Sequence, residues 1–126
     1  MMSIARGEIY WVEFDPVKGR EQGGLRPALI VQNDVGNRYS PTTVVAAITR
    51  TIPPKAYPFV VIIEPEESGL PYRSVVNCSQ VATVQTSGSA SRFRPPPGAQ
   101  ELRPVIKLGM ETMERIAAEL RYNLGV

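Results

Sequence analysis

The chain has 126 residues, of which 43% are hydrophobic and 21% charged, and a formal net charge of +2. This length and composition predict one globular domain, residues 1–126, with a single modest core, and they exclude a disordered chain. The longest apolar runs have the length of a strand, far below the roughly 20 residues that cross a bilayer, and the first residues lack the apolar core of a secretion signal. We therefore expect a cytoplasmic protein with no membrane segment.

The sequence contains no histidine and one cysteine, Cys78. A lone cysteine excludes an internal disulfide, and without histidine almost no ligands are left for a zinc or iron site. We expect Cys78 to be a small buried hydrophobic residue. Any hydrolytic chemistry near neutral pH must also work without the usual general base and without the common catalytic triads. The sequence thus predicts no metal and no cofactor.

The predicted elements begin with β-strands. Glu8–Phe14 is rich in β-branched and aromatic residues and stops at an Asp-Pro turn signal, which predicts the first strand. Apolar runs predict two more strands, at Pro27–Gln32 and Thr43–Thr49, and the Gly, Asn and Pro residues between them predict a loop over Asn33–Thr42. A proline-rich segment then leads into the fourth predicted strand, Phe59–Ile63.

The next part of the chain alternates between polar and apolar segments. Glu64–Gly69 predicts a polar turn, and Ser74–Val84 predicts either one long strand, bent at Asn77 and Ser79, or two short strands. Residues 85–104 are dominated by Ser, Gly, Ala and Pro. This composition predicts a flexible or extended insertion without a regular element.

The end of the chain changes to a helical period. Val105–Leu108 predicts a short closing strand, and apolar residues recurring at intervals of three and four predict a helix over Met110–Asn123. We expect one apolar helix face, packed on the core or on a second copy, made of Met110, Met113, Ile116, Ala117, Leu120 and Leu124. Several short strands and one terminal helix predict an α+β, mainly β fold: a small antiparallel barrel that the helix closes or covers.

The strongest candidate for a functional site lies in Gly19–Val31. Two adjacent glycines, Gly23 and Gly24, let the backbone approach a ligand closely, and an apolar strand follows. Arg26 stands between the glycines and the strand, with Pro27 fixing the φ angle behind it. A guanidinium at the mouth of a rigid strand can hold an oxyanion through two N–H groups, so we expect Arg26 to bind a phosphate.

Thr49 is the second candidate, because it ends an apolar strand as Arg26 begins one, and such strand ends can converge in a small barrel. The alternatives are a Thr49 hydroxyl that satisfies a strand-end amide and an Arg26 that forms a surface salt bridge. A phosphate-binding P-loop is excluded, because no Gly-Lys-Ser/Thr follows the glycines and the chain enters a strand. No spacing supports a catalytic carboxylate pair among Asp15, Glu21 and Asp34.

Several of these segments occur together, and in the same order, in one known family. Arg6–Tyr10, Gly19–Pro27, Gln32–Thr42 and Ala46–Thr49 together resemble the MazF/PemK toxin endoribonucleases of toxin-antitoxin systems. The resemblance is close over about residues 6–84 and looser at the C-terminal end. It implies an SH3-like barrel (CcdB/PemK-like) with a C-terminal helix, and a homodimer. It also implies metal-independent, sequence-specific cleavage of single-stranded RNA, including mRNA, which inhibits translation and growth.

The resemblance also implies partners and site residues. The implied partners are single-stranded RNA and a cognate MazE-like antitoxin whose extended acidic tail blocks the RNA groove, with DNA reached only through that antitoxin. The catalytic arginine and threonine of the family correspond by position to Arg26 and Thr49. The residues that we expect to contact RNA are Arg20, Gln22, Gly24, Tyr39, Arg50, Tyr57 and Gln80.

RNA carries its own nucleophile, the 2′-hydroxyl, so an enzyme needs only to align it with the phosphorus and to stabilise the charge on the phosphoryl oxygens. Arg26 would hold the phosphate, and Thr49 would donate a hydrogen bond to it or orient the 2′-hydroxyl. Because an arginine is a poor proton acceptor, Glu21 is the candidate for helping to deprotonate that hydroxyl. The predicted products are a 2′,3′-cyclic phosphate and a 5′-hydroxyl.

The sequence departs from the family pattern in three places. Arg20 stands where many relatives carry a small residue, Ser79 and Ala82 replace a glutamate and an arginine on either side of Gln80, and the segment 85–104 is longer than usual. These departures leave the cleavage sequence open but leave the catalytic pair untouched. The same barrel also serves toxins that poison a topoisomerase, as well as passive RNA binders. A non-catalytic binding module is therefore the alternative.

Overall fold

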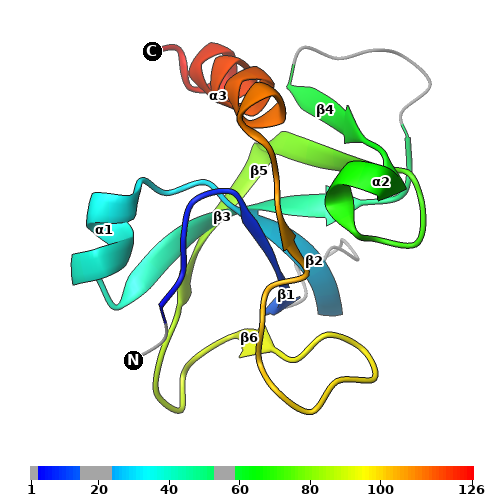
Figure 1. Ribbon diagram of the computed structural model, residues 1–126. Helices are drawn as coiled ribbons and strands as arrows, with labels where there is room; N and C mark the ends of the chain where they lie inside the picture. Colours follow the sequence, from blue (N-terminus) through cyan, green and yellow to red (C-terminus); the bar gives the residue numbers. More distant parts are fainter. Residues whose placement is uncertain (1–2, 15–23, 53–58) are drawn as a thin grey trace.

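The computed structural model describes residues 3–14, 24–52 and 59–126. In these ranges the chain forms a curled sheet in which the strands pair in the order β4-β5-β3-β2-β1-β6, and β7 also pairs with β1 (Figure 1). Every pairing is antiparallel. The strands are β1 (Glu8–Phe14), β2 (Gly24–Ile30), β3 (Thr42–Thr49), β4 (Val60–Ile63), β5 (Ser74–Gln85), β6 (Phe93–Arg94) and β7 (Ile106–Lys107).

The described residues also form three helices, α1 (Asp34–Tyr39), α2 (Pro65–Ser68) and α3 (Met110–Leu124). The predicted C-terminal helix is confirmed as α3, which packs against β4 and β5 (Figure 1). Its apolar face is narrower than predicted, because Met110 and Leu124 are 83% and 60% exposed. Within the described ranges, no helix combines the length and the hydrophobicity needed to span a bilayer.

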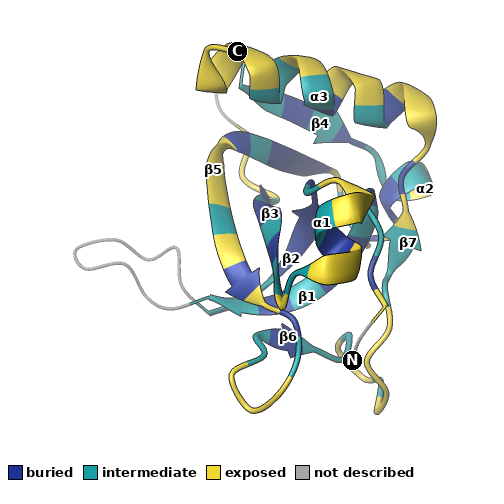
Figure 2. Cartoon of the chain, turned by 90° about the vertical axis from the view of Figure 1, so that its left-hand side faces the viewer, coloured by how far each residue is buried: buried dark blue, intermediate teal, exposed yellow. Residues whose placement is uncertain are grey.

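Successive residues of a strand point to opposite faces of the sheet, and each face has its own core. The face under α3 carries what we call the helix-side cluster: Ile9, Leu29, Val31, Ala46, Ile48, Val61, Ile63, Leu70, Val76, Cys78, Leu108 and Ile116. The face turned away from α3 carries the far-side cluster: Ile4, Tyr10, Val12, Ala28, Ile30, Val45, Val84 and Phe93. Figure 2 shows buried residues inside the curl of the sheet and exposed residues along the outer side of α3.

The prediction of a loop over Asn33–Thr42 was wrong at its centre, where α1 forms. Asn33 caps this helix, since its side-chain oxygen accepts a hydrogen bond from the N–H of Gly36 at 2.8 Å. Asn37 is buried, and its side-chain oxygen accepts hydrogen bonds from Gln32 at 3.0 Å and Thr43 at 2.6 Å. Tertiary hydrogen bonds thus stabilise α1, although the Gly and Asn content of the segment predicted a loop.

The predicted polar turn over Glu64–Gly69 contains the short helix α2 instead. Glu64 and Glu67 form a reciprocal capping box, and Pro65 occupies the first turn. Gly69 ends the helix in a left-handed conformation with a φ of 73°. The end signals of a helix were therefore present in the sequence, although the helix is only four residues long.

The expectation of one long strand with a bend is confirmed for β5. Ala46 pairs with Val81 and Ile48 pairs with Val76, so the four residues 77–80 of β5 lie opposite Ala47 alone. Within this bulge, the side-chain oxygen of Asn77 accepts hydrogen bonds from the N–H and the hydroxyl of the residue two positions later. A bulge of this kind bends a strand and increases its twist, which helps the sheet to curl.

Two elements come from the last third of the chain. The predicted closing strand is confirmed as β7, which pairs with β1. The interpretation of residues 85–104 as free of regular elements needs a correction, because Phe93–Arg94 forms β6 on the edge of β1. Phe93 is 4% exposed and packs its ring 5.0 Å from that of Tyr10. One large apolar residue therefore anchors a segment whose composition is otherwise typical of a loop.

Candidate active site

The strand register brings Arg26 and Thr49 onto the same face of neighbouring strands. Ala28 of β2 is opposed to Ala47 of β3 in the last pair of this ladder, and Arg26 and Thr49 each lie two residues beyond that pair on their own strands. Residues directly opposed in an antiparallel pair point to the same face. Ala28 belongs to the far-side cluster, so the arginine and the threonine both lie on the far side. The predicted convergence of the two strand ends is in keeping with this topology.

Arg26 is half-buried beside apolar neighbours. In the β1–β2 ladder Arg26 is opposed to Val12, which is fully buried. The next residue of β2 on the same face, Ala28, is also fully buried. Among the described residues, no carboxylate forms an ion pair with Arg26. A guanidinium next to apolar walls interacts more strongly with an anion than one surrounded by water. The surroundings of Arg26 would therefore strengthen its interaction with a bound anion.

Thr49 ends β3 and is also half-buried. Its hydroxyl oxygen accepts a hydrogen bond from the N–H of Thr51 at 3.2 Å, which is the strand-end contact expected as an alternative to a catalytic role. A hydroxyl that accepts one hydrogen bond still has its own proton to donate. The contact therefore orients the Thr49 side chain and leaves its donor available.

A cationic aromatic pair lies beside Thr49. The guanidinium carbon of Arg50 is 5.0 Å from the ring centroid of Tyr72, a cation–π contact. Arg73 next in the chain is paired with Glu64 at 2.9 Å. Sequence reasoning missed Tyr72, although an aromatic residue between a turn and an arginine was an available signal. The pair holds the predicted RNA contact Arg50 at the same end of β3 as the candidate catalytic threonine.

Gly24 begins β2 and has a φ of +91°. A Cβ built on this residue would meet nothing within 4 Å, so the backbone conformation, and not a lack of space, requires glycine here. Gly24 is opposed to Phe14 at the end of β1. The chain therefore enters β2 beside an aromatic ring, two residues before Arg26.

Two further predicted RNA contacts lie at different distances from Arg26 and Thr49. Gln80 is exposed in the bulge of β5 that lies opposite Ala47, two residues before Thr49 on β3. Tyr39 is 75% exposed at the end of α1, which precedes the first residue of β3, whereas Thr49 is the last (Figure 1). β3 itself is roughly 23 Å long, with α1 before its first residue and Thr49 at its end. The structure does not bring Tyr39 to the candidate site.

Four of the predicted site residues, Arg20, Glu21, Gln22 and Tyr57, lie outside the described residues. Their roles stay predictions.

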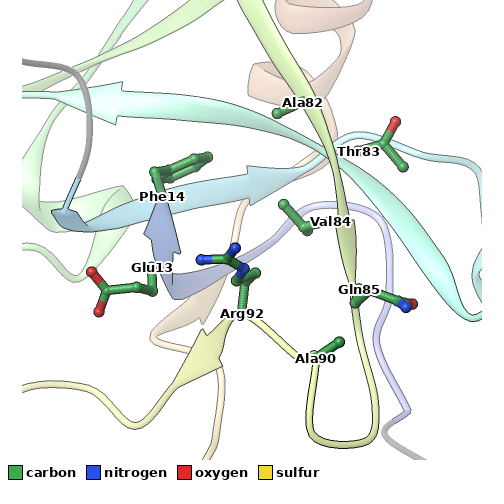
Figure 3. Close-up of a pocket in the computed structure, with 8 residues that line it drawn as sticks. All are labelled: Glu13, Phe14, Ala82, Thr83, Val84, Gln85, Ala90 and Arg92. Carbon is green, nitrogen blue, oxygen red and sulfur yellow. The ribbon is translucent and has the colours of Figure 1, made fainter. Parts of the chain in front are cut away.

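A hollow of about 380 Å³ opens on the far side between the end of β1 and the second half of β5 (Figure 3). It is lined by Glu13, Phe14, Ala82, Thr83, Val84, Gln85, Ala90 and Arg92. Figure 3 shows the Phe14 ring, the Arg92 guanidinium and the side chains of Ala82 and Val84 directed toward this space, whereas Thr83 and Gln85 point away from it. Sequence reasoning missed the hollow, because its two sides are distant in the chain.

Burial shifts the pKa of two groups in the cores. The thiol of Cys78 is fully buried, forms no disulfide and donates to the carbonyl of Ile116 at 4.0 Å. Burial, with a smaller contribution from Glu119, raises its pKa to about 11. A thiol of this kind is a poor nucleophile near neutral pH, which agrees with the structural role expected for Cys78. Burial also raises the pKa of Tyr10, and the nearby carboxylate of Glu8, which accepts a hydrogen bond from the Tyr10 hydroxyl at 3.2 Å, adds to the shift.

Comparison with known proteins places these features in context. The sequence profile of the PemK-like, MazF-like toxins of type II toxin-antitoxin systems matches residues 5–124. Endoribonuclease EndoA of Bacillus subtilis (strain 168) is 45% identical over 83 residues, which are 66% of this chain and 72% of the relative.

Solved structures resemble the whole fold. MazF (Form-I) from Deinococcus radiodurans superimposes with a TM-score of 0.74 at 22% identity, over 100% of both chains. An endoribonuclease in complex with its cognate antitoxin, from Mycobacterial species, gives a TM-score of 0.73 at 22% identity, over 98% of this chain and 96% of that one. These similarities confirm the predicted fold, a mainly antiparallel curled sheet with a C-terminal helix.

Proposed function

This chain belongs to the PemK-like, MazF-like toxins of type II toxin-antitoxin systems and is an endoribonuclease, and we propose that it cleaves single-stranded RNA through the RNA's own 2′-hydroxyl. The observation that supports the proposal is that Arg26 and Thr49 both follow the last pair of the β2–β3 ladder, Ala28 and Ala47, on the face of the sheet that carries the far-side cluster. Single-stranded RNA fits because only unpaired nucleotides can lay both a phosphate and splayed bases on one protein surface.

Arg26 binds the scissile phosphate in this proposal. Its guanidinium has five N–H donors in a planar fork, which matches two phosphoryl oxygens at once. Because no described carboxylate pairs with it, no internal ion pair with these residues has to break before the phosphate binds. Negative charge accumulates on the phosphoryl oxygens as the 2′-hydroxyl attacks, and a donor already in place stabilises that charge most effectively.

Thr49 donates its hydroxyl proton to a phosphoryl oxygen or to the attacking 2′-oxygen. The hydrogen bond from the N–H of Thr51 fixes the position of the hydroxyl oxygen, so little reorganisation is needed when the substrate binds. Glu21 assists by accepting the proton of the 2′-hydroxyl. The products are a 2′,3′-cyclic phosphate and a 5′-hydroxyl, and no metal takes part.

The RNA strand extends past this pair along the far side. In this proposal Arg50, whose guanidinium lies on the ring of Tyr72, contacts a phosphate on one side of the cut, and the exposed Gln80 hydrogen-bonds an unpaired base edge. The predicted loop residues Arg20, Gln22 and Gly24, together with Tyr57, complete the RNA contacts in the proposal.

We also propose the biological setting. The protein acts in the cytoplasm as a homodimer, cuts mRNA and so inhibits translation and growth. A MazE-like antitoxin neutralises it by occupying the RNA groove and links it to DNA. The solved relatives include a toxin bound to its cognate antitoxin and MazE-MazF complexes from Deinococcus radiodurans, which supports this choice of partner.

End mapping tests the chemistry. Purified protein is incubated with mixed RNA in EDTA, and the new ends are sequenced and typed. We expect 5′-hydroxyl and 2′,3′-cyclic phosphate ends, and no cut where the nucleotide before the scissile bond is 2′-deoxy. Cleavage of the 2′-deoxy substrate would refute 2′-hydroxyl attack, and loss of all cleavage in EDTA would refute metal independence.

The alternative is a non-catalytic module that binds RNA or poisons a topoisomerase. Folded Arg26→Ala protein separates the two possibilities, because a contaminating nuclease would not respond to this substitution. Full cleavage by the variant would overturn the assignment of the active site.

A further inference from the structure

We propose that Tyr72 is a positioning residue that holds the Arg50 guanidinium for a phosphate of the RNA next to the one that is cut. The inference rests on the proposed function, because it assumes that the scissile phosphate lies at Arg26 and Thr49. It adds to that function the residue on which the second phosphate contact depends.

Arg50 and Tyr72 meet where β3 ends and β5 begins. Thr49, the last residue of β3, is opposed to Val75 in the β3–β5 ladder. Arg50 follows Thr49 directly, and Tyr72 lies two residues before β5 begins at Ser74. The strand pairing therefore brings the two side chains to the same end of the sheet, beside the candidate catalytic threonine.

Hydrogen bonds hold the backbone at both residues. The N–H of Thr51 donates to the hydroxyl of Thr49 at 3.2 Å, so the chain turns around Arg50. Ser74 is buried, and its hydroxyl donates to the carbonyl of Tyr72 at 3.0 Å. Because the chain is held at each end of the contact, the guanidinium and the ring meet at a defined place.

The contact between the two side chains suits a phosphate ligand. The guanidinium carbon of Arg50 lies over the ring of Tyr72, 5.0 Å from the ring centroid. A cation in this position is attracted by the negative face of the ring. The five N–H donors of a guanidinium lie in its plane, around its rim, and not on the face that meets a ring. The contact therefore holds Arg50 and leaves donors for two oxygens of a phosphate.

The charges around the pair also favour an anion at Arg50. Arg73, next to Tyr72, forms an ion pair with Glu64, with 2.9 Å between its Nε and the carboxylate oxygen. In the part of the chain that the structure describes, Arg50 has no such partner. Arg50 is exposed and Tyr72 is half-buried, so the ring anchors a cation that an RNA strand can reach. The charge of Arg73 is matched by Glu64, whereas that of Arg50 is available to a phosphate.

Tyr72 lowers the cost of ordering the arginine. A free arginine side chain populates many rotamers and loses that freedom when it binds a phosphate. A side chain already held on a ring has lost part of this freedom before the RNA arrives, so more of the interaction appears as affinity. The charge of a non-scissile phosphate does not change during the reaction. The contribution of Tyr72 should therefore appear in KM and not in kcat.

Neutral phosphate replacements test the proposal. A short RNA that the wild type cuts is made with one methylphosphonate at a time at the non-scissile positions, and kcat/KM is measured for each. We expect one replacement beside the cut to lower the wild-type value by about tenfold, the loss typical of a hydrogen bond to a charged group. Arg50→Gln should be insensitive to that replacement, whereas the matched control Arg73→Gln should retain the full loss.

Variants of Tyr72 separate the ring from the bulk of the side chain. Tyr72→Leu and Tyr72→Met keep an apolar side chain without a π-face, and each should raise KM by about twofold to fivefold with little change in kcat. Tyr72→Phe keeps the ring and should restore the wild-type KM. Tyr72→Leu combined with Arg50→Gln should add nothing to Arg50→Gln alone, because the ring acts through the guanidinium.

The resonances of Arg50 report the contact in the absence of RNA. Protons that lie over an aromatic ring are shifted upfield, so the side-chain protons of Arg50 should move downfield in Tyr72→Leu and keep their positions in Tyr72→Phe. Arg50 resonances that do not respond to Tyr72→Leu would refute the contact in solution.

Two kinetic outcomes would also overturn the inference, provided that urea unfolding shows the variants to be folded. One is a methylphosphonate series in which no non-scissile position distinguishes Arg50→Gln from the wild type. The other is a wild-type KM, or a loss in kcat alone, in both ring-free variants of Tyr72. A wild-type protein that cuts no RNA would instead refute the proposed function, so the two failures are distinguishable.

Discussion

The two faces of the sheet are built by the same strands but serve different purposes. On the helix side, apolar residues of the strands form one buried cluster together with Ile116 of α3. On the far side, the apolar cluster is smaller and gives way to Arg26, Thr49 and a hollow. In β2, neighbouring residues such as Ala28 and Leu29 belong to opposite clusters. One strand thus contributes both to the stabilising core and to the site.

If this division holds, a substitution on the helix side should lower stability and leave the chemistry intact. Ile116 is the fully buried isoleucine of α3. Ile116→Ala removes packing and leaves a cavity, which should lower the free energy of unfolding by about 2–5 kcal/mol. Urea unfolding measures the loss. The matched control is Met110→Ala on the same helix, at a position that is 83% exposed, where we expect a change within about 0.5 kcal/mol.

The cleavage rate per folded Ile116→Ala molecule should stay within about twofold of the wild type. A large drop in that rate, at conditions where the variant is fully folded, would show that the two faces are coupled.

The opposite result is expected on the far side. Arg26→Ala removes a preorganised donor to the phosphate and should lower the cleavage rate by about 10²–10³-fold, or roughly 3 kcal/mol. Its unfolding free energy should change by less than about 0.5 kcal/mol, because no described residue forms an ion pair with it. Single-turnover kinetics measure the cleavage rate, and urea unfolding measures the unfolding free energy.

Arg38→Ala removes an exposed arginine from the last turn of α1 and serves as the control for charge. Equal rate losses in Arg26→Ala and Arg38→Ala would reduce the role of Arg26 to general attraction of RNA.

A pH series probes the buried part of the far side. The pKa of Tyr10 is raised in the folded protein, first by burial and then by Glu8, so its stabilising effect is present below the unfolded pKa of about 10 and is lost as the pH rises above it. The unfolding free energy of the wild type should therefore fall above pH 10, by up to about 1.4 kcal/mol per pH unit from this group. Tyr10→Phe should fall less steeply.

Cys78, with a folded pKa raised to about 11, contributes a decline of the same sign in both proteins, so the difference between the two curves isolates Tyr10. Parallel curves above pH 10 would contradict the assignment.

The smallest effect is expected at Tyr39. This residue is exposed at the end of α1, beyond the start of β3, so Tyr39→Ala should leave the cleavage rate of a short RNA within about twofold of the wild type. The predicted RNA contact then appears only as a raised KM for a longer RNA that reaches α1. A large loss on a short RNA would place the substrate elsewhere on the surface.

The sequence was most informative where one local signal decided the outcome. Alternating and apolar runs predicted β1 and β3 closely, and the helical period predicted α3 to within one residue of its end. The sequence did not predict α1, because this helix depends on the buried hydrogen bonds of Asn37 with Gln32 and Thr43. No local sequence pattern indicates these bonds.

The site divides in the same way. Arg26 and Thr49 could be chosen from the sequence, because each stands at the end of an apolar run, but the face of the sheet that they share depends on the strand register. The hollow could not be predicted, because the contact between Glu13 and Arg92 joins residues that are far apart in the chain. Tyr72 was missed for the same reason, since its partner Arg50 belongs to another strand end.

The pairing of β1 with the last third of the chain has a consequence for the order of folding. Glu8 is opposed to Lys107 and Val12 to Phe93. The outer edge of β1 therefore pairs with residues that are synthesised about 80–100 residues later. The β1–β2 and β2–β3 ladders join much closer parts of the sequence and form with a smaller loop-closure cost. The strands that carry Arg26 and Thr49 can thus pair on the nascent chain, whereas β6, β7 and α3 are added last. The outer edge of β1 and the helix that covers the other face of the sheet are therefore completed only after residues 93–124 have been made.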